Sequence, residues 1–325
     1  MDKRAKIYVA GHHGMVGSAI WRKLQGHGYE NLLGRMHQEL DLCNQAQVEE
    51  FFTHEKPEYV FLAAAHVGGI LANDTYRADF ISQNLAIQTN VVRAAYKHDV
   101  KRLLFLGSSC IYPRECPQPI KEEYLLSGPL EKTNEPYAVA KIAGLKMCES
   151  YNRQYGAEYF AVMPTNLYGP NDNFDLETSH VLPALIRKFV EAKKTSAKVV
   201  KVWGTGNVKR EFLHVYDAAE ACIHLMSSDS REIEGVIGGG VAADYMCHIN
   251  VGTGQDVTIA ELVDIIKAEV GYLGCVEYDR SKPDGTPRKL LEVGRMSALG
   301  WDSRIPLREG IRQTVDWYLS EGGST

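Results

Sequence analysis

The sequence has few of the features that mark membrane, secreted or nucleic-acid-binding proteins. No apolar run approaches the roughly 18 residues that suggest a membrane-spanning helix. The apolar segment near the start, 7–10, is far shorter than the core of a signal peptide. No run of Lys and Arg stands out, and the formal net charge is −5. We therefore expect neither a membrane nor nucleic acid as a partner.

Cysteine usage argues against a secreted or zinc-binding protein. The seven cysteines are odd in number, none forms a C-x-x-C pair, and no cluster has the spacing of a zinc site. A chain of 325 residues can bury a core without disulfide cross-links. We expect free cysteines, a cytoplasmic location and no bound metal.

Short apolar runs alternate with stretches of helical length through the first half of the chain. Strands are expected near 6–11, 31–34, 59–65 and 102–109, and helices over 16–27, 76–97 and 136–155. Continuous apolar strands between helices pair in parallel and are covered on both faces. The pattern predicts an α/β fold with a doubly wound parallel sheet, whose ligands bind at the carboxyl ends of the strands.

The alternation stops after residue 168, where the polar loop "GPNDNFDLETSH" begins. The remainder predicts a smaller mixed α/β domain. We assign 1–168 with about 208–232 to a Rossmann domain, and about 169–207 with 233–325 to a substrate domain. The glycine-rich segment 234–252 has no functional interpretation.

A glycine-rich loop follows the first strand. In "GHHGMVG", Gly11, Gly14 and Gly17 let the backbone turn tightly and approach a pyrophosphate, whose charge then lies at a helix N-terminus. The spacing differs from the common G-x-G-x-x-G, and the alternative is a turn that only packs. Because a strand precedes it and a helix follows, we expect a dinucleotide.

The end of the second strand indicates which dinucleotide. An acidic residue there would hold a ribose hydroxyl and favour NAD, but this zone holds Arg35 and His37, with His13 expected opposite. Cations accommodate a 2′-phosphate, so NADP(H) is the expected cofactor. The alternative for Arg35 is an ordinary solvated surface charge.

Tyr137 and Lys141 form a Y-x-x-x-K pair on a predicted helix. Four residues apart, they share one helix face. A phenol has a pKa near 10, and a neighbouring ammonium favours the phenolate, so the tyrosine could exchange a proton with a carbonyl oxygen. Ser108, where the fourth strand opens, could bind the same oxygen or simply close off the strand.

These motifs together resemble the short-chain dehydrogenase/reductases, in their extended, nucleotide-sugar-modifying branch. "REFLHVYDAAEA" (210–221) also resembles that branch, as do "LGSSCIYP", "PTNLYGPNDNF", "SHVLPALIRK" and "SKPDGTPRKLL". Those longer matches narrow the resemblance to bifunctional NADP-dependent 3,5-epimerase-4-reductases. The resemblance implies GDP-4-keto-6-deoxy-D-mannose as the substrate.

The implied substrate supplies a role for Cys110. A ketone at C4 acidifies the protons on C3 and C5, and inversion needs an acid and a base on opposite ring faces. Cys110, two residues beyond Ser108 and expected on the same strand face, is the candidate base, with His180 as the partner acid. Unaided by the resemblance, Cys110 is a buried small hydrophobe and His180 a cap neighbour or surface residue.

The resemblance also implies the binding residues. For the cofactor they are Gly11, His13, Gly14, Met15, Val16, Gly17, Arg35, His37, Leu62, Ala63, Ala64, Lys141, Pro164, Asn166, Leu167 and His180; for the GDP-sugar they are Lys188, Trp203, Arg210 and Asp284. The family often has arginine where His13 stands and another basic residue where His37 stands. We therefore expect NADPH preference to be looser and pH-dependent, and an NADH to NADPH efficiency ratio near or above one would contradict this.

Two other functions remain possible at this point. The first is another enzyme of the branch, a nucleotide-sugar 4-epimerase or 4,6-dehydratase. A 4,6-dehydratase often has Asp and Glu after the strand-four serine, where this chain has Ser109 and Cys110. A non-catalytic NADP-binding sensor typically lacks the tyrosine or the lysine, and this chain has both. A homodimer through 84–97 and 138–155 is expected from the branch and from the small and apolar residues there.

Overall fold

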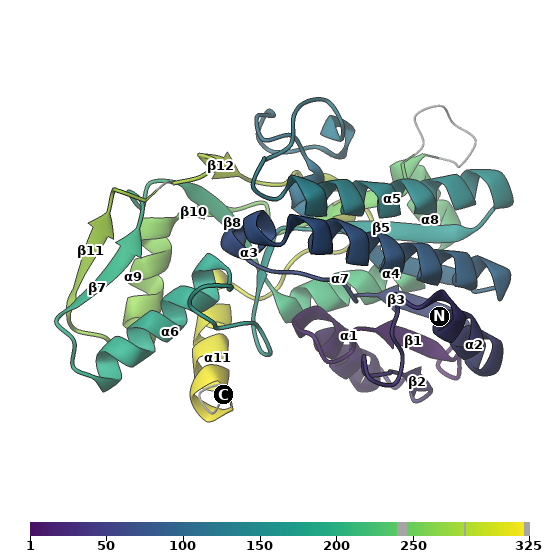
Figure 1. Cartoon of the computed structure of the whole chain (residues 1–325), viewed down its shortest axis with the longest axis horizontal. Helices are drawn as coiled ribbons and strands as arrows, with labels where there is room; N and C mark the ends of the chain where they lie inside the picture. The colour runs from purple at the N-terminus through teal and green to yellow at the C-terminus, as the bar shows by residue number, and fades with distance from the viewer. Residues whose placement is uncertain (239–245, 283, 322–325) are drawn as a thin grey trace.

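The computed structural model describes residues 1–238, 246–282 and 284–321 (Figure 1). Its larger sheet has six parallel strands in the order β2-β1-β3-β4-β5-β9. These strands are β1 (Ile7–Ala10), β2 (Leu32–Leu33), β3 (Tyr59–Leu62), β4 (Arg102–Leu106), β5 (Glu158–Pro164) and β9 (His248–Val251). The doubly wound parallel sheet expected from the sequence is therefore confirmed.

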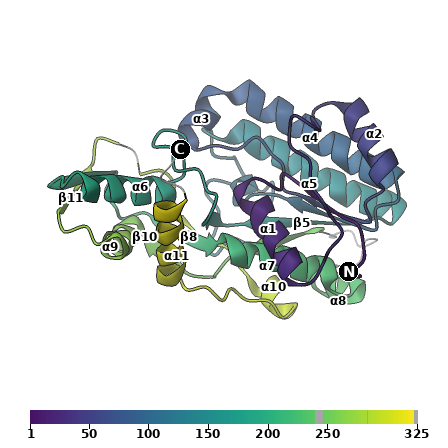
Figure 2. The same cartoon turned by 90° about the horizontal axis from the view of Figure 1, so that it is seen from below.

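Helices cover both faces of this sheet because its central strands are apolar on both sides. The helices of the larger unit are α1 (Met15–Gly26), α2 (Gln45–Glu55), α3 (Ile70–Thr75), α4 (Arg77–Lys97), α5 (Glu135–Tyr155), α7 (Val215–Ser227), α8 (Ser230–Ile237) and α10 (Gly294–Ala298). Figure 2 shows α2, α4 and α5 on one face, and α1 and α7 on the other. Strands such as β1 and β3 are almost completely buried between these layers.

The smaller unit lies beyond the carboxyl ends of the large sheet (Figure 1). It contains β6 (Asn166–Tyr168), β7 (Val199–Trp203), β8 (Lys209–His214), β10 (Asp256–Thr258), β11 (Cys275–Asp279) and β12 (Arg288–Lys289), with helices α6 (Val181–Lys194), α9 (Ile259–Val270) and α11 (Leu307–Ser320). Strand β8 pairs with β6, β10 and β12, and β7 pairs with β11. A separate apolar core joins α6, α9 and α11.

The division between the two units differs from the expected boundaries in two respects. Strand β8 lies in the segment 208–232 expected for the Rossmann domain, yet it pairs with β6, β10 and β12 in the smaller unit. Strand β9 lies inside the segment expected for the substrate domain, yet it pairs with β5 and completes the large sheet. Leu291, Met296 and Trp301 also pack into the larger core. In the glycine-rich segment 234–252, the structure shows the end of α8 and strand β9, while 239–245 lie outside the described residues. The chain therefore crosses between the units more often than the sequence pattern indicates.

The described part of the chain contains no helix with the length and apolarity to cross a membrane. Within the same residues, no group of three or more His, Cys, Asp and Glu side chains is placed to hold a metal ion.

Candidate active site

The glycine loop between β1 and α1 has the close-packed backbone that a bound pyrophosphate requires. Gly11 has a φ of 81°, and a Cβ there would lie 2.8 Å from the backbone nitrogen of Ala64. A Cβ on Gly17 would lie 2.0 Å from the carbonyl oxygen of Gly11. Gly14 is the N-cap of α1 and carries no capping side chain, so the first backbone N–H groups of the helix stay available for an anion. These residues fit a dinucleotide.

The rest of the predicted cofactor wall lies at neighbouring strand ends. Leu62 ends β3, and the backbone nitrogen of Ala63 donates to the carbonyl oxygen of Ala10 at 3.0 Å. Pro164 ends β5, and Asn166 and Leu167 begin β6, which pairs with β8 in the smaller unit. The carboxyl ends of β1, β3 and β5 lie at one edge of the parallel sheet, and β6 follows directly after the end of β5.

The basic residues predicted for the 2′-phosphate are partly engaged within the protein. Arg35 donates to Glu55 at 2.6 Å and to the carbonyl oxygen of Gly34 at 2.8 Å. His37 is well exposed and lies 3.8 Å from Asp41. His13 is exposed beside His12, with 4.3 Å between their ring centroids. The pH-dependent NADPH preference stays a prediction.

The loop after β4 differs from the geometry expected for Ser108 and Cys110. Strand β4 ends at Leu106, and residues Ser109–Ile111 form a 3-10 turn, so the argument that the two side chains share a strand face does not hold. Instead, the Ser108 hydroxyl caps the turn and accepts from the backbone nitrogen of Cys110 at 3.3 Å. The turn still holds the two side chains next to one another. Cys110 is free and 8% exposed.

Tyr137 and Lys141 lie in the first turns of α5, which starts with Pro136 near its N-terminus. Lys141 is almost fully buried, and its Nζ donates to the carbonyl oxygen of Leu106 at 2.6 Å. The same Nζ lies 5.8 Å from the centre of the Tyr137 ring. The pair therefore borders the end of β4, next to the turn that carries Cys110.

Burial controls the charges of this pair more than their mutual attraction does. Burial lowers the pKa of Lys141 to about 8, with the Cys110 thiol opposing that shift. Burial, with a smaller contribution from Cys110, raises the pKa of Tyr137. Without a cofactor, Lys141 does not depress the pKa of Tyr137 as the sequence argument expected, because both groups are desolvated and the ammonium is bound to Leu106. In its protonated form, the Tyr137 phenol can act as a proton donor.

His180 is the N-cap residue of α6, but its side chain makes no capping hydrogen bond. The side chain is exposed, while the protein around it and the charge of Lys289 lower the pKa of its imidazole. Just before it, the carbonyl oxygen of Thr178 accepts from the backbone nitrogen of Gly69 at 2.7 Å, which joins this loop to the segment after β3. His180 therefore faces solvent at the start of α6, and its pKa lies below the ordinary value of 6.5.

Lys289 is the site residue that motif reasoning missed. It lies on β12 opposite Arg210 of β8, and burial lowers its pKa. Its charge acts on Cys110, His180 and Arg210, which come from three separate parts of the chain. The stretch "SKPDGTPRKLL" contained it, but only the pairing of β12 with β8 brings it to the site.

The residues predicted for the GDP-sugar form two groups around β7 and β8. Lys188 of α6 lies with its Nζ 5.5 Å from the Trp203 ring, and Trp203 is 62% exposed at the end of β7. An exposed indole beside two lysines, Lys188 and Lys282, is typical of a surface that stacks on a ligand ring. Burial lowers the pKa of Lys188.

Arg210 and Asp284 lie near one another at the start of β8. Burial lowers the pKa of Arg210, and Asp284 opposes that shift. The Asp284 carboxylate is already used within the protein, since it accepts from the backbone nitrogen of Thr205 at 2.7 Å and from its hydroxyl at 2.8 Å. Asp284 therefore holds the 204–206 turn beside Trp203, whatever it contributes to a ligand.

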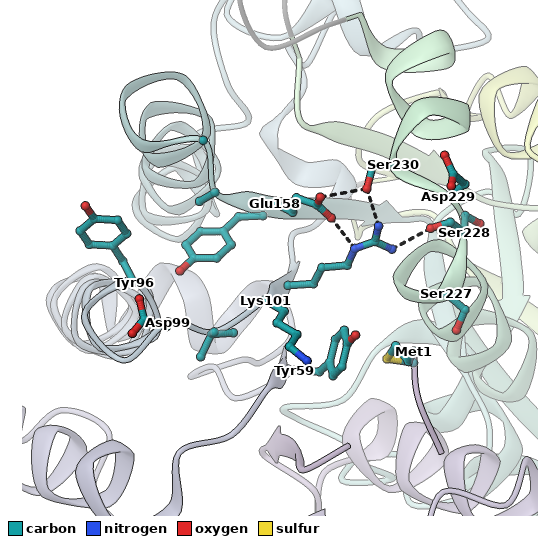
Figure 3. A pocket seen from close by; sticks show the side chains of 15 residues that line it. Met1, Tyr59, Tyr96, Asp99, Lys101, Glu158, Ser227, Ser228, Asp229 and Ser230 are labelled. Carbon is teal, nitrogen blue, oxygen red and sulfur yellow. Dashed lines mark hydrogen bonds and ion pairs between the residues drawn. The ribbon is translucent and has the colours of Figure 1, made fainter. Parts of the chain in front are cut away.

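A cavity of about 760 Å³ lies away from these residues, at the amino ends of β4 and β5 (Figure 3). Its most buried cation, Arg102, donates to Glu158 at 2.5 Å and to Ser230 at 2.6 Å, while Lys101 pairs with Glu58 at 2.6 Å. Because these cations are satisfied inside the protein, they tie β4, β5 and the segment before α8 together. None of the candidate catalytic residues lines this cavity.

The Rossmann sheet, the glycine loop and the Tyr–Lys helix define a dinucleotide-dependent enzyme of the extended short-chain dehydrogenase/reductase class. The sequence profile of the NAD dependent epimerase/dehydratase family matches residues 7–238, and the chain belongs to this family.

Within that family, the chain is similar to GDP-L-fucose synthases along nearly its whole length. It is 57% identical to GDP-L-fucose synthase 1 of Arabidopsis thaliana, covering 98% of this chain and 94% of that protein. It is 54% identical to the GDP-L-fucose synthase of Escherichia coli K12, covering 97% of each. A solved structure of MlghC, a GDP-mannoheptose C4 reductase from Campylobacter jejuni with NADP bound, has a TM-score of 0.89 at 41% identity, covering 98% of this chain and 100% of that one.

Proposed function

We propose that this protein is a GDP-L-fucose synthase, which inverts C3 and C5 of GDP-4-keto-6-deoxy-D-mannose and then reduces C4 to give GDP-L-fucose. The observation that carries the proposal is that a buried thiol, Cys110, lies in the turn directly after β4, whose last residue, Leu106, accepts from Lys141 of the Tyr137–Lys141 pair at 2.6 Å. A reductase alone needs the pair and not the thiol. The similarity to the synthases supports the same assignment.

NADPH, when bound, supplies the hydride that reduces C4. Gly11, Gly14 and Gly17 would hold its pyrophosphate at the start of α1, where backbone N–H groups are available. Lys141 would donate hydrogen bonds to the hydroxyl groups of the cofactor ribose. Its Nζ has two further donors beyond the one given to Leu106.

Proton transfer at C3 and C5 is assigned to Cys110 and His180. The C4 ketone makes each neighbouring carbanion an enolate, so a proton can leave to a base on one ring face and return from an acid on the other. Lys289 favours a negative charge on Cys110, since its ammonium lowers the pKa of the thiol against the effect of burial. The positive charges of Lys289 and Arg210 also suit a site for the substrate diphosphate.

Reduction needs a proton at the C4 oxygen, and Tyr137 is placed to give it. Its phenol is protonated because burial raises its pKa. The Ser108 hydroxyl, which accepts from the backbone nitrogen of Cys110 and also interacts with its thiol, is assigned the role of donating its O–H to the same oxygen. The two chemistries can therefore use one carbonyl without moving the substrate.

The assignment is tested with the wild-type protein, GDP-4-keto-6-deoxy-D-mannose and NADPH in deuterated water. We expect cofactor oxidation and a GDP-fucose product that carries deuterium at both C3 and C5. An unlabelled product with C4 reduced would indicate a simple C4 reductase. A labelled substrate without cofactor oxidation would indicate an epimerase alone.

We also infer a homodimer in the cytoplasm. Helices α4 and α5 lie side by side on one face of the sheet, and they expose Tyr96, Val139 and Tyr155. All seven cysteines are free, which suits a reducing compartment. Sedimentation at micromolar concentration should give twice the chain mass of 36.3 kDa, and cell fractionation should place the protein with cytoplasmic markers. A single-chain mass would contradict the dimer.

A further inference from the structure

Glu211 is a buried carboxylate at the centre of the site that the proposed chemistry leaves without a role. It follows Arg210 on β8 and is 0% exposed. Its Oε1 accepts from the backbone nitrogens of Thr253 at 2.6 Å and Gly254 at 2.8 Å, and its Oε2 accepts from the backbone nitrogen of Leu291 at 3.0 Å. One side chain therefore binds two separate loops, and no ligand can reach it.

The backbone of Glu211 joins a third segment to the same point. Its carbonyl oxygen accepts from the Thr165 hydroxyl at 3.2 Å and from the Asn166 side-chain nitrogen at 2.8 Å. Thr165 and Asn166 directly follow β5, where the cofactor wall is predicted. Glu211 thus connects the cofactor side of the site with the loops on the substrate side.

The loop bound at Leu291 is the one that carries Lys289. Leu291 also bridges to Ile120, whose backbone nitrogen donates to the carbonyl oxygen of Leu290 at 2.7 Å. Lys289 pairs with Arg210 on β8, so two partly buried cations lie on adjacent strands and repel each other. Other contacts must therefore hold the two side chains in place against this repulsion. Glu211 supplies one of them, because it binds the backbone of Leu291, two residues beyond Lys289.

We propose that Glu211 is a positioning residue that holds Lys289 beside Arg210, and thereby forms the diphosphate site of the GDP-sugar. This proposal rests on the proposed function. Glu211 acts through the backbone of Leu291 and not through contact with the substrate. The dense packing around it supports a geometric role, since a Cβ on Gly252 would lie 2.3 Å from its Oε1.

A carboxylate is required because every group bound to its oxygens is a donor, namely three backbone N–H groups and, at 3.4 Å, the Thr253 hydroxyl. Glutamine has one accepting oxygen, and its NH₂ group would face a donor at the other position. Glu211→Gln therefore frees either the Leu291 loop or the 253–254 turn. Aspartate keeps the charge but is one methylene shorter, so it cannot reach both loops.

The test measures binding of GDP and of NADPH to the full chain separately, by calorimetry and by cofactor fluorescence. We expect Glu211→Gln to weaken GDP binding by about 10- to 100-fold, as for the loss of hydrogen bonds to a charged group. NADPH binding should stay within about two-fold, because the backbone bonds to Thr165 and Asn166 remain. The KM for the GDP-sugar should rise with the GDP dissociation constant.

Asp217 provides the matched control. It lies in the same stretch of sequence, is 5% exposed, and accepts from the backbone nitrogens of Arg304 at 2.9 Å and Ile305 at 2.8 Å. Asp217→Asn should lower the unfolding temperature and leave GDP binding unchanged. Equal losses of GDP and NADPH binding in Glu211→Gln, or a GDP loss in Asp217→Asn of the same size, would show a structural role only and overturn the proposal.

A second variant keeps the proposal testable if Glu211→Gln does not fold. Glu211→Asp should weaken GDP binding by at least about five-fold, and unchanged GDP binding in the folded protein would overturn the proposal. In a Lys289→Met background, the Glu211 substitution should add little further loss, since both act on one site. If the wild-type chain itself does not bind GDP, that result contradicts the proposed function. Loss of GDP selectivity in the variants alone bears only on the positioning role of Glu211.

Discussion

Tyr137→Phe is expected to lower the rate of C4 reduction by about 10²- to 10⁴-fold, the usual contribution of a positioned proton donor. Burial keeps the Tyr137 phenol protonated by raising its pKa, and phenylalanine removes only that proton and its oxygen. Deuterium exchange at C3 and C5 should stay within a few-fold of wild type, because Cys110 and His180 are untouched. Cofactor oxidation and NMR of the sugar measure the two reactions in one sample.

Tyr159→Phe is the control for Tyr137→Phe. Tyr159 is also buried, but it lies on β5 and lines the cavity at the opposite end of the sheet. It should leave both reactions near wild type. If folded Tyr137→Phe lost exchange and reduction equally, the division of roles between Tyr137 and Cys110 would be wrong.

Cys110→Ser should reduce deuterium exchange by about 10²-fold or more while leaving NADPH binding unchanged. A serine hydroxyl is a far weaker acid than a thiol, so it does not form the anion that removes a carbon-bound proton at neutral pH. The variant should still reduce a sugar that has already been epimerised. Cys43→Ser, which changes an exposed free cysteine, should leave both reactions intact.

The pH profile of exchange separates two assignments, one in which Cys110 is the base and His180 the acid, and one in which the roles are reversed. Burial raises the pKa of Cys110 above its ordinary value of 9.0, so the fraction of thiolate grows with pH, and exchange should still be rising at pH 9. Burial lowers the pKa of His180 below 6.5, so neutral imidazole is already the main form at pH 7. A profile that is flat between pH 7 and 9 would assign the base to His180 and the acid to Cys110.

Local patterns in the sequence were sufficient for the parts of the site that depend on one βα unit. The glycine loop, the start of α1 and the Tyr137–Lys141 spacing each follow from neighbouring residues, because the strand, turn and helix are short-range structures. The order of the predicted strands and helices in the first half also matches the structure. The turn at Ser109–Ile111 was missed, since three residues after a strand carry no clear periodic signal.

Contacts between residues far apart in the sequence could not be predicted from local patterns. Asp284 stays a predicted ligand residue, and its carboxylate also binds Thr205, which is 79 residues away. Arg35 stays a predicted phosphate residue, and it also pairs with Glu55 at the end of α2. Both side chains have partners that no local motif indicates.

The sequence by itself determined the doubly wound sheet, the cofactor loop and the Tyr–Lys pair, because hydrophobic periodicity and turn chemistry act over a few residues. Only the tertiary structure decided that Lys289 lies opposite Arg210, where its charge acts on Cys110 and His180, and that Glu211 binds the 253–254 turn and the backbone of Leu291. The reason is physical: a buried charge is stable only where distant segments supply its partners, and those partners are set by how the strands pair.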